Sequence, residues 1–226
     1  QKSLLEVDEL IGNLIDFLQS EKLEYEIIIL SEYGFNQVNN SISPNIILND
    51  NLLLQTRNIG GKEYIDFELS KAFAMCDHQI AHIFIKPGFE ETVTKIFEKQ
   101  PIGKILNKKM QKELHIDNER SGDIILTSEK NSWFNYHWWT DEKFAPDFTF
   151  SVDIHRKPGF DPLELFFDMK TKKISHDTSL IHGSHGIIDN EISKLPIIGT
   201  TISEKKLPEK LDMIEVLHKI QEFLEE

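Results

Sequence analysis

The stretch from Glu26 to Gly34 reads E-I-I-I-L-S-E-Y-G, an apolar run that becomes polar and ends at a glycine. An uninterrupted apolar run of this kind is typical of a strand buried on both faces of a parallel sheet. Between Ser3 and Ser20, apolar residues recur with the period of an amphipathic helix. A helix followed by a buried strand is half of a βαβ crossover. The sequence therefore predicts an α/β fold, and we expect the strand that opens this crossover to lie before Gln1.

The rest of the chain alternates short apolar segments with turn signals. The pattern predicts strands at 52–56, 63–67, 79–86, 123–127 and 163–167, and helices at 90–98, 104–113 and 208–224. The tetrapeptide N-I-G-G, Asn58 to Gly61, separates the first two strands as a hairpin turn would. The order of strands and helices between Ile80 and Thr127 indicates a small α+β unit inserted over the main sheet.

The charge balance limits the classes of partner. The 226 residues carry 25 Lys and Arg against 38 Asp and Glu, a net charge of −13. This excess of acid argues against a nucleic-acid polymer or an anionic membrane surface as partner. No apolar run reaches the roughly 18 residues of a membrane span. The single cysteine, Cys76, excludes an internal disulfide, which fits a reducing compartment, so we expect a cytoplasmic protein.

A second informative stretch, Leu180 to Asn190, reads L-I-H-G-S-H-G-I-I-D-N. His182 and His185 lie there beside glycines and outside any periodic apolar pattern, and histidine is the commonest metal ligand. The S-E-Y-G of Ser31 to Gly34 follows the apolar strand, and ligands of open α/β sheets collect beyond the carboxyl ends of strands. The two stretches predict a metal centre at that edge, although a polar strand end with a turn glycine also explains S-E-Y-G.

Asp77, His78 and His82 form the pattern D-H-x-x-x-H, which resembles a ligand cluster. Positions four apart on one strand lie roughly 13 Å apart, too far to share one metal. We therefore expect His82 to be a structural histidine with a hydrogen-bond partner. His78, at the entry of the strand, stays open.

Taken together, these stretches resemble the type I phosphodiesterase/nucleotide pyrophosphatase branch of the alkaline phosphatase superfamily. The resemblance rests on I-I-I-L-S-E-Y-G at Ile27 to Gly34, R-S-G-D-I-I-L at Arg120 to Leu126 and G-S-H-G at Gly183 to Gly186. It covers most of the chain but only the later, C-terminal portion of the family's domain. It implies part of an alkaline-phosphatase-like sheet flanked by helices, with the core at 1–35 and 151–226 and an inserted α+β cap at 36–150.

The resemblance also implies a metal centre. In that family the strand-end motif is S-D-H-G, whose Asp and His bind one of two zinc ions, and Glu32 and Tyr33 stand at those positions here. Glu can replace Asp as an oxygen ligand, whereas a Tyr phenol must lose a proton of pKa about 10 to bind zinc. The family's late G-x-H-G histidine, a ligand of the other zinc, corresponds to His185. We expect a divalent metal, zinc or manganese, with Tyr33 putting one of the two sites in question.

The implied activity is that of a metal-dependent phosphoryl hydrolase, of the phosphodiesterase or nucleotide pyrophosphatase type, acting on a small phosphorylated substrate. Two metals would activate a hydroxyl nucleophile for in-line displacement at phosphorus. The family's Thr or Ser nucleophile would lie before Gln1. We therefore expect a fragment that is inactive on its own.

Candidate substrate contacts follow from composition, not from the resemblance. His155, Arg156 and Lys157 place three potential cations in a row, which we expect to steer the anionic substrate unless they are merely solvated. Trp138 and Trp139 belong to an aromatic cluster, which either packs a cap onto the sheet or stacks on a ligand. We expect one of these two rings to line the leaving-group side of the site.

Three other interpretations stay open. The first is a non-catalytic binding module that keeps the fold with a degraded metal site, which Tyr33 favours. The second is an unrelated α+β protein whose histidines are structural. The third is a sulfatase- or phosphonate-type hydrolase on the same scaffold, because a fold does not fix the reaction. The sequence gives no oligomeric state.

Overall fold

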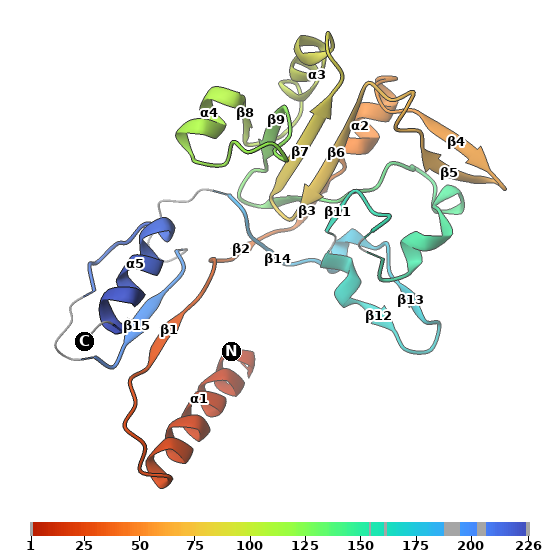
Figure 1. Ribbon diagram of the computed structural model, residues 1–226. Helices are drawn as coiled ribbons and strands as arrows, with labels where there is room; N and C mark the ends of the chain where they lie inside the picture. The colour runs from red at the N-terminus through yellow and green to blue at the C-terminus, as the bar shows by residue number, and fades with distance from the viewer. Residues whose placement is uncertain (1, 154, 161, 188–194, 203–206, 225–226) are drawn as a thin grey trace. The chain divides into compact units, whose positions relative to one another are not determined.

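The computed structural model describes residues 2–153, 155–160, 162–187, 195–202 and 207–224 (Figure 1). Contacts divide the chain into two compact units, one of Gln1–Glu32 with Pro196–Glu226 and one of Tyr33–Leu195. Among the described helices, none is both long enough and apolar enough to cross a membrane. All the predicted site residues except Glu32 belong to the larger unit.

The smaller unit contains one pair of strands and, near the two ends of the chain, two helices. Helix α1 (Lys2–Ser20) confirms the predicted amphipathic helix, and α5 (Met213–Leu224) lies within the predicted closing helix. Strand β1 (Ile28–Leu30) pairs antiparallel with β15 (Ile198–Thr200). The prediction of a buried parallel strand is therefore wrong for this pairing, and the last two residues of β1 are exposed. An apolar run carries no information on the direction of the strand that will pair with it.

A five-stranded mixed sheet is the centre of the larger unit (Figure 1). In sheet order its strands are β11 (Gly159–Phe160), β6 (Ala72–Asp77), β7 (Ile80–Ile85), β9 (Ile124–Thr127) and β8 (Lys104–Leu106). Strand β11 joins β6 in parallel, and the other neighbours are antiparallel. The sheet confirms the strands predicted at 79–86 and 123–127, and the protein has the mixed α/β character that was predicted.

Short elements surround this sheet. The helices are α2 (Pro44–Asp50), α3 (Glu90–Phe97) and α4 (Lys108–Glu113). The paired short strands are β2 (Asn36–Gln37) with β14 (Gly183–Ser184), β3 (Asn40–Ile42) with β10 (Ser132–Phe134), β4 (Thr56–Ile59) with β5 (Lys62–Ile65), and β12 (Phe167–Asp168) with β13 (Lys173–Ile174). Single 3-10 turns occur at Glu142–Phe144, Asp147–Phe150, Pro162–Leu165 and Thr178–Leu180.

Three predicted elements differ from the structure for local reasons. The strand predicted at 163–167 is mostly a 3-10 turn that begins at Pro162, whose ring fixes φ in the helical range. The helix predicted at 104–113 is strand β8 followed by α4, because the Asn107 side chain accepts a hydrogen bond from the Met110 amide and caps the helix there. The strand predicted at 52–56 is largely a turn, and β4 begins at its last residue.

The core of the larger unit packs α2 and the aromatic segment 133–139 against the sheet. Asn45 of α2 is fully buried, and its side chain exchanges two hydrogen bonds with the backbone of Ala74 on β6, at 3.0 and 2.8 Å. Trp138 is also buried, and its indole Nε1 donates to the Glu63 carbonyl at 2.9 Å. These bonds satisfy polar groups inside the core and fix the helix and the aromatic segment in place.

The division predicted from the family plan, with a core at 1–35 and 151–226 and a cap at 36–150, stays a prediction. Contacts group the chain at other boundaries, since β11 of the predicted core adds a strand to the sheet of the predicted cap. Contact units and the insertion history of a domain are different properties, so the one does not test the other.

Candidate functional site

His185 lies directly after β14, in the G-S-H-G loop. Strand β14 is held against β2, and the amide of Val38, just beyond β2, donates to the His182 carbonyl at 3.0 Å. The amide of Gln79 donates to the carbonyl of His185 at 2.8 Å. Ser184, between the two histidines, is fully buried. The backbone of the loop is therefore fixed on both sides of His185.

Gly186 allows the turn that follows His185. Its φ of +118° is a conformation that residues with a Cβ rarely adopt. A Cβ built there would lie 3.2 Å from Cγ1 of Ile80, so a larger residue would also press on β7. The glycine after His185 in the G-S-H-G motif therefore permits a turn that other residues would not adopt.

Five aromatic and imidazole rings form a continuous row through His185. Tyr33 stacks on His185 with ring centroids 3.7 Å apart and planes 10° apart, and Phe35 contacts Tyr33 edge-on at 5.5 Å. His185 also contacts His78 at 4.0 Å, with planes 33° apart, and His78 stacks on Phe160 at 5.1 Å. Phe35 also contacts the His185 ring edge-on at 5.5 Å, and no described residue forms a hydrogen bond with either nitrogen of that ring.

His78 is held beside His185 by an unusual turn. It is one of only two residues between β6 and β7, and its φ of +54° is uncommon for a residue other than glycine. Its Nδ1 lies 2.5 Å from Asp77 Oδ1, and its carbonyl accepts from the Phe134 amide at 2.7 Å. A carboxylate on one ring nitrogen fixes the tautomer and orientation of a histidine. The sequence left the role of His78 open. Its position at the entry of the strand, in the hairpin turn, was the indication that it could have one.

Burial favours the neutral form of the His185 side chain. Desolvation is the main cause that lowers the pKa of His185, the charge of His78 lowers it further, and the Asp77 carboxylate opposes both. Neutral imidazole is the form that binds a metal, because binding requires the free lone pair of a ring nitrogen.

His82 is structural, as predicted. Its Nδ1 accepts a hydrogen bond from the Gly122 amide at 3.1 Å, and burial lowers the pKa of His82. The bond links β7 to the loop before β9, so this histidine holds the sheet and not a ligand.

The three predicted steering cations lie in different environments. Lys157 is buried, and its Nζ lies 2.5 Å from Glu164 Oε1. Arg156 is exposed and pairs with Asp153, with Nε 2.5 Å from Oδ2, while His155 is exposed. Because the charges of Arg156 and Lys157 are already paired, the structure gives them local roles, and their role in steering a substrate stays a prediction.

The two candidate tryptophans lie in the core. Trp138 is 1% exposed and Trp139 is 5% exposed. Trp139 stacks on His137 at 4.6 Å and contacts Trp138 edge-on at 4.9 Å. Their packing agrees with the alternative in which the aromatic cluster packs against the sheet. A role for either ring on the leaving-group side stays a prediction.

The metal ligands predicted beside His185 fall into two groups. Tyr33 is in contact with His185, whereas Glu32 ends the smaller unit, and its approach to His185 stays a prediction. Within the described ranges, no three His, Cys, Asp or Glu side chains converge as a metal site would require. The role of His185 as a metal ligand therefore stays a prediction.

The family model for type I phosphodiesterase / nucleotide pyrophosphatase matches residues 1–161. The chain belongs to this family, within the alkaline phosphatase superfamily. Proteins of the family typically depend on metals and act on phosphorylated substrates.

The fold resembles part of a solved ectonucleotide pyrophosphatase / phosphodiesterase. The murine ectonucleotide pyrophosphatase / phosphodiesterase 5, alone or as an inactive variant in complex with AMP, matches with a TM-score of 0.51 and 18% identity. The human protein of the same name matches with a TM-score of 0.50 and 18% identity. Each match covers 86% of this chain and 39% of the other, so the chain spans well under half of these structures. No curated protein matches the sequence.

Proposed function

We propose that this chain is part of a metal-dependent phosphoryl hydrolase of the phosphodiesterase or nucleotide pyrophosphatase type. The observation that carries the proposal is the His185 imidazole, which stacks on Tyr33, contacts His78 at 4.0 Å and forms no hydrogen bond to a described residue through its nitrogens, while burial lowers its pKa. By the sequence resemblance, it corresponds to the late G-x-H-G histidine that the family uses as a ligand. Family membership supports the reaction class.

A divalent metal, zinc or manganese, would neutralise charge on the phosphoryl oxygens during in-line displacement. His185 would hold it through a ring nitrogen, and Glu32 would supply an oxygen ligand where the family has Asp. The remaining ligands and the hydroxyl nucleophile would come from residues outside this chain, which fits a match to 39% of the solved structures. In this plan, residues 36–150 are the cap, inserted between the core segments 1–35 and 151–226.

The proposed substrate is a small phosphorylated molecule. The inactive murine relative binds AMP in its solved complex, which makes a nucleotide ester a reasonable first substrate to test here. The net charge of −13 disfavours a nucleic-acid polymer as the substrate.

A second candidate function is a non-catalytic binding module on the same fold. Tyr33 favours it, because this residue stands where the family has a metal-binding histidine and its ring packs flat on His185. A phenol is protonated near pH 7 and is a poor zinc ligand in that form.

Metal content and turnover of the full-length protein separate the two functions. For the hydrolase we expect two equivalents of zinc or manganese by mass spectrometry, with hydrolysis of bis(p-nitrophenyl) phosphate that His185→Ala abolishes. A full-length protein with neither bound metal nor turnover would instead support the binding module.

The 226 residues alone test the placement of the nucleophile. We expect them to show no diesterase activity under conditions in which the full-length protein is active. Activity from this chain alone would mean that its own residues supply the nucleophile.

A further inference from the structure

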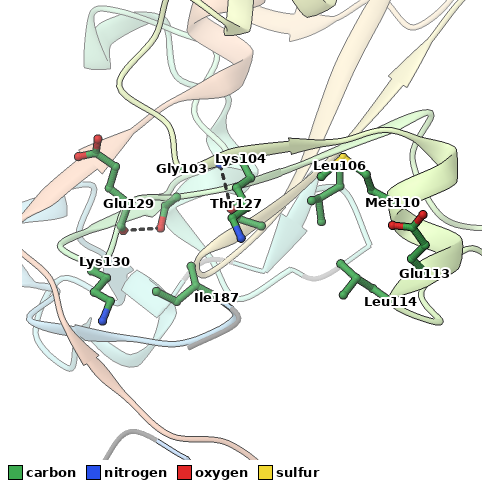
Figure 2. Close-up of a pocket in the computed structure, with 11 residues that line it drawn as sticks. Gly103, Lys104, Leu106, Met110, Glu113, Leu114, Thr127, Glu129, Lys130 and Ile187 are labelled. Atoms are coloured by element: carbon green, nitrogen blue, oxygen red, sulfur yellow. Dashed lines mark hydrogen bonds between the residues drawn. The ribbon is translucent and has the colours of Figure 1, made fainter. Parts of the chain in front are cut away.

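A cavity of about 470 Å³ lies close to His185 in the larger unit (Figure 2). Strand β8, helix α4, the end of β9 and residue Ile187 line it. In Figure 2, Leu106, Met110 and Leu114 lie at one end of the pocket, and Ile187 lies toward the other. The volume is in the range of small-molecule sites.

The interior of this cavity offers apolar contact. The two hydroxyl groups of its wall are already bonded: Thr127 Oγ1 accepts from the Lys104 amide at 3.1 Å, and Ser128 Oγ donates to the Ser132 carbonyl. Met110 and Ile187 are half-buried, so their side chains can still lose surface to a ligand. A ligand group that enters would gain by burying apolar surface and would find few free polar partners.

Among the described residues of the lining, Lys104 and Lys130 bring two positive charges, and Glu113 and Glu129 bring two negative charges. The apolar wall around them favours an uncharged ligand group, because burying a charge without a partner costs free energy.

The backbone of His185 lies near the wall of the cavity. Ile187 is two residues from His185, which places their backbones at most about 7 Å apart. The Gln79 amide donates to the His185 carbonyl, and the Ser128 amide donates to the Gln79 carbonyl. Two such steps of a hydrogen-bonded ladder separate His185 from the cavity wall by about 10 Å.

We propose that this cavity holds a bulky, uncharged apolar substituent of the substrate whose phosphoryl group lies at His185. The proposal rests on the proposed function, and it narrows the substrate class to phosphoryl esters with an aromatic or alkyl group. The bound ester would place its phosphorus at the edge of the His185 ring and its apolar group among Leu106, Met110, Leu114 and Ile187.

The test uses phosphonates, which have a stable P–C bond, and isothermal titration of the full-length protein. Methylphosphonate, octylphosphonate and 1-naphthylmethylphosphonate share the head group and differ in the apolar part. We expect at least one of the two larger probes to bind about tenfold tighter than methylphosphonate. A gain with the naphthyl probe indicates an aromatic substituent, and a gain with the octyl probe indicates an alkyl chain.

Leu114→Trp, which fills the cavity, is expected to remove this gain and to leave methylphosphonate binding unchanged. If Leu114→Trp does not fold, Leu114→Gln replaces it in the test. It is a smaller change at a residue that is already 37% exposed, and it is expected to reduce the gain. Leu69→Trp is the matched control, because Leu69 is exposed and does not line the cavity. No gain for either larger probe, or a gain that both Leu114 variants retain, would overturn the proposal.

Hydrolysis of bis(p-nitrophenyl) phosphate keeps this outcome separate from the proposed function. Turnover without tighter binding of the larger probes would reject the cavity assignment and leave the proposed function intact. A gain that Leu114→Trp removes, in a protein without turnover, supports the cavity and rejects the hydrolase.

Discussion

The ring of Tyr33 lies flat on the ring of His185, with centroids 3.7 Å apart and planes only 10° from parallel. His78 contacts the same ring at 4.0 Å. We propose that Tyr33 orients His185 and does not itself bind a metal.

Replacing Tyr33 distinguishes these two roles. Tyr33→Phe keeps the stacked ring and removes the phenol, whereas Tyr33→Ala removes both. If Tyr33 only orients His185, the zinc affinity of the full-length protein should fall about tenfold in Tyr33→Ala and stay within about twofold in Tyr33→Phe. Competition with a chelating dye measures both. Equal losses in the two variants would show that the phenol itself binds the metal.

The two histidines of the G-S-H-G loop should differ sharply. His185→Ala removes the neutral imidazole of the ring row, and we expect the zinc affinity of the full-length protein to fall by about 100-fold, with loss of turnover. His182→Ala is the matched control, because His182 is exposed and its contact to Val38 uses the backbone carbonyl. Metal binding that depends equally on both histidines would contradict the assignment.

Local patterns predicted those parts of the fold and site that local physics determines. The helical period gave α1, the apolar run gave β7, and the glycine beside His185 indicated a tight turn. Each of these follows from neighbours in the sequence, because side-chain period and backbone freedom are properties of a few successive residues.

Long-range pairing explains what the sequence did not predict. Phe160 reaches His78 because β11 pairs in parallel with β6, which places Phe160 opposite Asp77. The periodicity of apolar residues in the sequence contains no information on this pairing. In the same way, Lys157 was expected in a cationic surface run, but the turn at Pro162–Leu165 carries Glu164 to it and buries the pair.

The buried pair of Lys157 and Glu164 should be important for stability. Their side chains are 1% and 8% exposed, and removing one partner leaves the other charge buried. We expect Lys157→Met to lower the free energy of unfolding by about 3–5 kcal/mol. Lys157→Met combined with Glu164→Gln should recover part of that loss, because no unpaired charge remains. Urea denaturation measures all three proteins.

The exposed pair of Lys95 and Glu91 provides the control for this series. Its side chains are 63% and 83% exposed at a similar distance of 2.6 Å, and Lys95→Met should leave the urea midpoint nearly unchanged. A double variant at Lys157 and Glu164 that is no more stable than Lys157→Met would show that the loss comes from packing and not from charge.

His137 should make the fold sensitive to acid. Burial lowers the pKa of His137 to about 3, and the positive charges of His176 and Lys157 add to this effect. The unfolded chain takes up the proton near pH 6.5 and the folded chain does not, so this contribution to stability is complete above pH 6.5 and falls as the pH drops toward 3. The free energy of unfolding should decrease by roughly 1.4 kcal/mol per pH unit within that window.

Urea titrations at pH 7.5 and pH 5 test this dependence. His137→Gln cannot take up a proton and should reduce the slope. The half-buried His176, whose pKa is also lowered by burial, should keep part of the slope. An unchanged slope in His137→Gln would assign the acid sensitivity to other groups.

Comparing two buried glutamines can separate the effect of fixing the His185 loop from the effect on the stability of the whole fold. Gln79 is fully buried, accepts a hydrogen bond from Asn36 at 3.2 Å, and donates from its side chain to the Ser132 carbonyl at 2.9 Å. Its side chain thus fixes the backbone amide that holds the His185 carbonyl. Gln111 is equally buried and donates to the Leu106 carbonyl at 3.0 Å, beside β8.

Gln79→Leu and Gln111→Leu should both destabilise the fold, by about 1–3 kcal/mol for each buried group left without a partner. Only Gln79→Leu should also weaken zinc binding by the full-length protein, because only Gln79 is bonded to the His185 loop. The comparison needs urea denaturation together with zinc titration at a temperature where both variants are folded. Equal zinc affinity in the two variants would mean that the position of His185 is fixed by the ring row and not by the backbone network of Gln79.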